Sequence, residues 1–109
     1  MSWDIQETYA LYRPESADLT VHSEELKQQF STWQEKHLII NLLGVPVLLP
    51  ALESFEEAIE EHRGRNKSFV LVHDQYSYDE LPETLPVVPT VQEAHDLIEM
   101  EEIERDLGF

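Results

Sequence analysis

His37-Leu38-Ile39-Ile40-Asn41-Leu42-Leu43 is a short run that is mostly apolar on both faces of an extended chain. Such a run is typical of a central strand that is covered on both sides, as in parallel sheets. A second run of the same character follows at Ser68–Val72. Because right-handed crossovers place successive parallel strands side by side, the two runs predict neighbouring strands of one buried sheet.

A helix is expected before the first of these strands. Ser23 can cap it, and it should end near Glu35 or Lys36. Its apolar residues recur at helical spacing, which predicts one buried face made of Leu26, Phe30 and Trp33.

A second helix is expected between the two strands. Pro50 suits its first turn, and Gly64 is the natural cap at its C-terminal end. Its apolar face would consist of Leu52, Phe55 and Ile59.

A third helix follows the residues Thr90 and Glu93, which form a capping-box pattern. Its outer face is strongly acidic. Its inner face would consist of Ala94, Leu97, Ile98 and Ile103.

The remaining segments complete the sheet. Alternation from Trp3 onward predicts one or two antiparallel strands before Pro14. Residues 73–86 are polar and interrupted by proline, which predicts a loop, and Leu85–Val88 predicts a short edge strand because proline lacks a donor. The chain is therefore expected to be an α/β protein with a mixed, mostly parallel sheet of four to five strands and about three to four helices.

Composition excludes several classes. The chain has 109 residues, with 7 Lys or Arg against 23 Asp or Glu, a formal charge of −16, and no cysteine. Direct binding to nucleic acid or to an anionic membrane surface is disfavoured by this charge. The nearly uncharged stretch Leu38–Leu52 is too short to span a bilayer, so no membrane insertion is expected. The first residues do not resemble a signal peptide, and a cytoplasmic location is expected.

Few residues suggest catalysis or metal binding. His73-Asp74 follows a strand, but neighbours on an extended chain point to opposite sides. No nucleophile elbow or glycine-rich phosphate loop is present. An acidic helix produces metal-like sets by chance, which favours a solvated face over a zinc site for His95, Glu99 and Glu102. The chain is therefore expected not to be an enzyme, and no cofactor or metal is expected.

Two stretches near the end of the chain carry a family resemblance. Val87-Val88-Pro89-Thr90-Val91-Gln92-Glu93-Ala94 and Met100-Glu101-Glu102-Ile103-Glu104-Arg105-Asp106-Leu107 resemble the end of bacterial members of the STAS domain family, named after sulfate transporters and anti-sigma factor antagonists. The expected order of strands and helices is compatible over nearly the whole chain. The resemblance implies a single STAS-like domain, similar to anti-sigma factor antagonists, over residues 1–109.

The resemblance also implies where a switch would lie. In the family, an Asp-Ser-Ser/Thr-Gly motif opens the helix after the central strand, and a partner kinase phosphorylates its hydroxyl. The corresponding residues are about Leu49-Pro50-Ala51-Leu52, which have no hydroxyl and follow no acid. Its place one turn into the second helix favours an ordinary helix-surface serine over a displaced phosphosite for Ser54. The connection between the last two strands is short, so a family helix is expected to be missing there.

The expected function is a non-catalytic protein–protein interaction or regulatory module. By the resemblance, its partner would be an anti-sigma-factor-like kinase or another regulatory protein that meets the surface around the second helix. Aromatic residues of the loop either cover the sheet edge or contact a partner. The apolar segment Val45–Leu49 could also favour a homo-oligomer. The candidate partner-binding residues are Pro50, Glu53, Ser54, Glu57, Tyr76 and Tyr78.

Two alternatives stay open. The acidic run Glu99–Asp106 could steer the chain to a basic partner, so the protein could be an acidic inhibitor or accessory protein of a nucleic-acid-processing enzyme. Family relatives with this kind of tail are often encoded beside ribonuclease Z, a tRNA-processing nuclease. Some members of the wider family bind nucleotides or lipids, although no residue here argues for either ligand.

Overall fold

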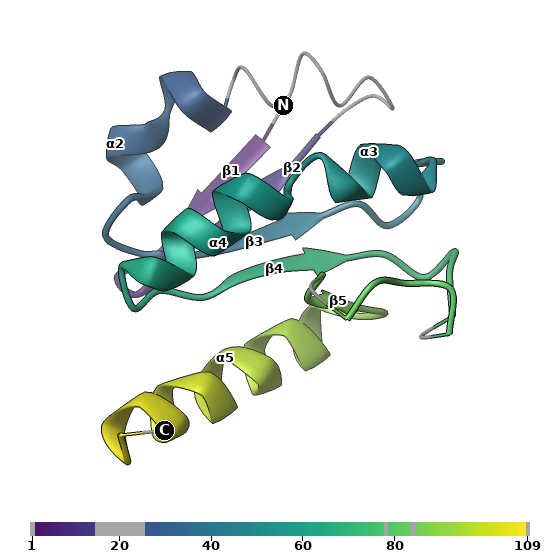
Figure 1. Cartoon of the computed structure of the whole chain (residues 1–109). Helices are drawn as coiled ribbons and strands as arrows, with labels where there is room; N and C mark the ends of the chain where they lie inside the picture. The colour runs from purple at the N-terminus through teal and green to yellow at the C-terminus, as the bar shows by residue number, and fades with distance from the viewer. Residues whose placement is uncertain (1, 15–25, 78, 84, 109) are drawn as a thin grey trace.

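The computed structural model describes residues 2–14, 26–77, 79–83 and 85–108. These residues form one five-stranded sheet in the order β1-β2-β3-β4-β5 (Figure 1). β1 (Ser2–Ile5) runs antiparallel to β2 (Tyr9–Arg13). From β2 onward all strands are parallel, through β3 (His37–Asn41), β4 (Phe69–Val72) and β5 (Val87–Val88). The expected mixed, mostly parallel α/β sheet is confirmed.

The helices lie in two unequal layers. α2 (Phe30–Trp33), α3 (Leu49–Glu53) and α4 (Glu56–Gly64) cover one face of the sheet. α5 (Val91–Asp106) covers the other face. The strands follow one another across the sheet, so right-handed connections between the parallel strands all lie on the same face. α5 follows the last strand, is not part of such a connection, and can cover the other face.

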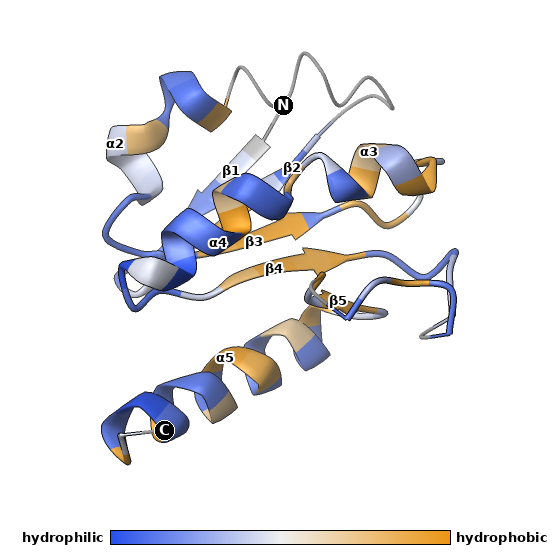
Figure 2. Ribbon diagram, viewed as in Figure 1, coloured by the Kyte–Doolittle hydropathy of each residue, from blue (hydrophilic) through white to orange (hydrophobic). Residues whose placement is uncertain are grey.

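Each face of the sheet has its own core. Alternate residues of one strand enter opposite cores, as Ile40 and Ile39 of β3 do. Figure 2 shows hydrophobic residues along the middle of β3 and along β4. The larger core lies under α2, α3 and α4 and includes Tyr12, Trp33, Leu52, Phe55 and Phe69. The smaller core lies over α5 and consists of Ile39, Val70, Val72, Ala94 and Ile98.

The connection between β4 and β5 contains no helix in its described residues 73–77, 79–83 and 85–86. The loop packs on the larger core instead, where Leu85 is buried and Tyr76 and Leu81 are partly buried. β5 is an edge strand of two residues, as the proline-bounded pattern predicted.

The second helix differs from the expectation in its continuity and its end. Turn residues at Ser54 and Phe55 separate α3 from α4. The Ser54 hydroxyl donates to the carbonyl of Ala51 at 2.5 Å, a local bond that competes with helical geometry. Gly64 is the last residue of α4 rather than its left-handed cap, because the positive φ, 64°, belongs to Asn66.

Two apolar residues assigned to buried faces are exposed instead. Phe30 is 37% exposed, and a turn at Gln29 separates residues 26–28 from α2. Ile103 is 59% exposed. It lies five residues after Ile98, a rotation of about 140° away from the buried face at roughly 100° per residue.

The N-terminus of α5 matches the capping pattern. The Thr90 hydroxyl oxygen accepts from the backbone N–H of Glu93 at 3.1 Å, as expected for a capping box. The Glu93 carboxylate accepts from the same hydroxyl at 3.2 Å. Ser23, the expected cap of the first helix, lies outside the described residues. Among the described helices, none is long and apolar enough to cross a membrane.

Candidate functional site

Residues Leu49–Leu52, which the family resemblance aligned with the switch, form most of α3. Leu48 is the N-cap residue of α3, and no side chain caps this helix. Leu48 is 74% exposed, the largest exposure among the large hydrophobic residues described. Pro50 follows in the first turn and is also exposed. An apolar side chain therefore projects into solvent at this position.

The preceding loop is fixed from two sides. Gly44 has φ +79°, a left-handed conformation that favours glycine. Arg13 donates to the carbonyl of Leu43 at 3.2 Å. From the loop after β4, the Tyr76 hydroxyl donates to the carbonyl of Val47 at 2.8 Å. The loop before the exposed N-terminal end of α3 is thus held by hydrogen bonds from Arg13 and Tyr76.

His73 takes part in the same bracing. Its Nδ1 accepts from the N–H of Gln75 at 3.0 Å, so its Nε2 carries the proton and donates to the carbonyl of Val45 at 3.2 Å. Both ring nitrogens are engaged, and Asp74 is exposed. Both ring nitrogens of His73 therefore bond to the backbone, and neither bonds to Asp74.

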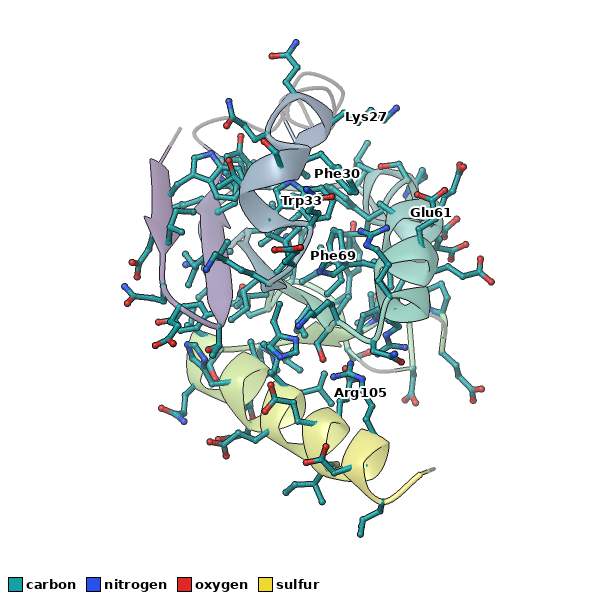
Figure 3. The ribbon with its side chains drawn as sticks, turned by 90° about the vertical axis from the view of Figure 1, so that its left-hand side faces the viewer. Lys27, Phe30, Trp33, Glu61, Phe69 and Arg105 are labelled. Carbon is teal, nitrogen blue, oxygen red and sulfur yellow. The ribbon has the colours of Figure 1, made fainter. Side chains whose placement is uncertain are left out.

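A cavity of about 420 Å³ opens between α2 and α4. Its volume lies within the range of roughly 300–1,000 Å³ that is usual for ligand pockets. Figure 3 shows Phe30 and Trp33 on α2 and Phe69 on β4 in the space between the two helices. The remaining apolar lining comes from Leu26, Phe55 and Ala58.

The rim of the cavity carries balanced charges. Lys27 and Arg65 contribute two cations, and Glu57 and Glu61 contribute two carboxylates. The guanidinium of Arg65 lies 4.9 Å from the centre of the Phe30 ring, within the range of a cation–π contact. Arg65 thereby holds the exposed ring of Phe30 at the mouth of the cavity.

Arg65 is anchored by His62, which is fully buried. Arg65 donates to His62 Nδ1 at 2.8 Å, and His62 Nε2 donates to the carbonyl of Lys36 at 2.7 Å. Burial, and then the positive charge of Arg65, lowers the pKa of His62 to about 4. The histidine is therefore neutral at physiological pH, with its ring edge-on to Trp33 at 5.1 Å.

The candidate partner-binding residues lie in three places. Ser54 and Glu57 line the cavity. Pro50 and Glu53 are exposed on α3, the short helix that precedes the cavity-lining residue Ser54. Tyr76 is partly buried and bonded to the β3–α3 loop, whereas Tyr78 lies outside the described residues.

Two of the three candidate metal ligands of the tail helix have other contacts. His95 packs edge-on against Tyr9 at 4.7 Å. Glu102 accepts a hydrogen bond from Nε2 of His37, whose Nδ1 accepts from the N–H of Ser68 at 2.9 Å. Throughout the described part of the chain, no three His, Asp or Glu side chains gather as metal ligands.

A polar cluster that the sequence analysis missed joins α5 to the sheet. Glu101 accepts from Arg63 at 2.7 Å and from the buried Ser68 hydroxyl at 2.6 Å. Arg105 donates to the same hydroxyl at 2.8 Å. The cluster could have been found from the sequence, because Glu101 and Arg105 follow the inner-face residue Ile98 at helical spacing and therefore lie on the same face.

The cavity was also missed, because its aromatic residues were assigned wholly to the core. The available signal was Arg65, which follows Ala58 and Glu61 at helical spacing and so lies on the same side of α4.

No protein-family model matches this chain, and no curated protein matches it either.

Proposed function

We propose that this protein is a STAS-like, non-catalytic protein-binding module that acts in the cytoplasm. Its binding surface would be the α3–α4 surface, defined as Leu48, Pro50, Glu53, Ser54 and Glu57 together with the adjoining cavity. The observation that carries the proposal is the position of Ser54 and Glu57. Both belong to the predicted interaction surface, and both line the aromatic cavity.

The cavity suggests what the partner presents. Interfaces obtain most of their affinity from a few aromatic or apolar anchors that fill desolvated pockets. A pocket floored by Trp33, Phe55 and Phe69 fits such an anchor. The mixed charges of its rim would orient polar groups around the anchor, while Leu48 would supply a second apolar contact.

The same surface supports binding without a phosphorylation switch. Phosphorylation acts by adding roughly two negative charges at an interface. The start of α3 offers Leu48, Leu49 and Pro50, none of which can be phosphorylated. The partner, an anti-sigma-factor-like kinase or another regulatory protein, would therefore bind the unmodified chain constitutively.

The test is an affinity capture from lysate of the native host, with quantification of the retained proteins. Glu57→Lys and Leu48→Asp should each remove a kinase-fold or sigma-system protein that the wild-type chain retains. Glu60→Lys is the matched control, because Glu60 is exposed on α4 but does not line the cavity. Circular dichroism would establish that all variants fold alike.

Retention of the same partner by all three variants would remove this surface from consideration. A partner lost at high salt, and displaced by nucleic acid, would instead support the acidic inhibitor or accessory protein of a nucleic-acid-processing enzyme. If only a second copy of the chain were captured, constitutive binding to another protein would be rejected in favour of a homo-oligomer.

A further inference from the structure

The outward face of α5 carries an apolar stripe. Met100, Ile103 and Leu107 are 55%, 59% and 65% exposed. Their spacing of three and then four residues places them on one side of the helix, away from the buried Ala94 and Ile98. Single exposed apolar residues are ordinary, but an aligned set on one helix face indicates a contact surface.

Acidic side chains border this stripe. Glu99 and Asp106 lie along one side of it and Glu104 along the other, by their positions around the helix. All three are exposed. None of them forms an ion pair with any residue that the structure describes.

The two arginines nearest α5 point elsewhere. Arg105 is the one Lys or Arg in α5, and its guanidinium donates to Ser68 beneath the helix. Within the described residues, Arg63 pairs with Glu101 on that same inner side. Over residues 99–107, the outward face is therefore apolar along its middle and negative along both borders.

We propose that this face binds a basic amphipathic helix of another protein. Such a helix has an apolar seam flanked by Lys or Arg, which complements both features of α5. Amphipathic helices dock through apolar residues spaced by three or four positions, and charges beside the seam determine which partner is accepted.

The charge pattern selects this occupant over a second copy of the chain. Two α5 helices packed through their stripes would bring acidic borders together, with no cation on that face to compensate. Like charges placed opposite each other at an interface are destabilising and exclude such a partner. A purely electrostatic contact would not need Met100, Ile103 and Leu107.

The inference is independent of the proposed function. The α3–α4 surface lies on the opposite side of the sheet from α5 (Figure 1). Occupation of one surface would leave the other accessible. The domain could therefore hold two partners at once.

The test uses a fluorescent synthetic peptide of roughly 18 residues made of leucine and lysine, a length at which such a helix is stable once docked. Leucine would be placed at helical spacing in the probe, and a permuted peptide of equal composition would break that spacing. Fluorescence anisotropy would be measured at about 0.15 M salt, where exposed charges are screened beyond roughly 8 Å.

The amphipathic peptide should bind at least roughly tenfold more tightly than the permuted one. The combined change Met100→Gln, Ile103→Gln and Leu107→Gln should weaken its binding by a similar factor without altering the net charge. Leu48→Gln is the matched control, since it removes an exposed leucine from the opposite side of the domain, and it should leave binding unchanged.

Three results would overturn the proposal. They are equal binding of the two peptides, equal binding by wild type and the triple variant, and no binding of either peptide. Light scattering provides a separate readout. A dimer that the wild-type chain forms and the triple variant does not form would show that a second copy of the chain occupies the stripe.

Discussion

Acidification between pH 7 and pH 5 should destabilise this protein through His62. Its ring is fully buried against Trp33 and Phe69. Burial, aided by the neighbouring positive charge of Arg65, lowers its pKa from 6.5 to about 4. The unfolded chain therefore binds more protons than the folded chain between these two values. The stabilisation is fully present above pH 6.5 and is lost as the pH falls towards 4.

The magnitude follows from this difference. At pH 5 the histidine is protonated in the unfolded chain and still neutral in the folded one. The free energy of unfolding should then fall by about 1.5 pH units at roughly 1.36 kcal/mol each, or about 2 kcal/mol relative to pH 7. Above pH 5 most carboxylates keep their charge, and the difference between wild type and a variant without this histidine isolates its contribution from that of the other four histidines.

The assay is urea unfolding followed by tryptophan fluorescence at pH 5, 6 and 7, compared between wild type and His62→Gln. Glutamine cannot be protonated in this range, and its amide can still donate to the carbonyl of Lys36, as His62 does. His95→Gln is the control, because His95 is only partly buried. The control should keep the wild-type pH dependence.

Two results would refute this reasoning. Equal losses of stability in wild type and His62→Gln between pH 7 and pH 5 would show that His62 is protonated in the folded protein. A greater stability of the wild-type chain at pH 5 would reverse the sign. Trp33 lies beside His62, so its fluorescence should also respond if the buried ring gains a proton.

Two further predictions concern the backbone and the cluster beneath α5. Gly64→Ala should stabilise the protein by about 0.5–1 kcal/mol in thermal unfolding, since Gly64 is helical and nothing lies near its missing side chain, whereas Gly44→Ala should cost about 1 kcal/mol because its φ is +79°. Equal effects of the two substitutions would contradict the backbone argument. Glu101→Ala should cost about 2 kcal/mol in urea unfolding because it leaves the Ser68 hydroxyl and Arg63 without their carboxylate, whereas the exposed Glu104→Ala should change stability by less than about 0.5 kcal/mol. Similar losses at both positions would exclude a specific role for the cluster.

The sheet could be predicted from the sequence because its signals are local and strong. An apolar run at His37–Leu43 has to be covered on both faces, and a second run at Ser68–Val72 has to pair beside it. Proline next to Val87 limits the last strand to an edge. Thr90 caps α5 by a bond to a residue three positions away, which the sequence alone specifies.

The candidate site was predicted only in part. Ser54 and Glu57 were chosen from the family resemblance, and the structure places them beside a cavity that no local pattern contains. Its lining brings together residues far apart in the chain, such as Phe30 and Arg65, which contact each other. A contact between residues of different elements depends on how those elements pack, and periodicity within one helix does not report it.

What the sequence determined by itself is therefore the element order, the buried strands, the Thr90 cap of α5 and the strong negative charge. The tertiary structure decided which side chains of a helix face the sheet and which face solvent. Ile103 is apolar but faces outward, whereas Glu101 is charged but faces the sheet. The physical reason is that burial depends on which neighbouring layer a side chain meets. At this end of α5, Ser68 before β4 and Arg63 at the end of α4 donate hydrogen bonds that favour a carboxylate over an apolar side chain.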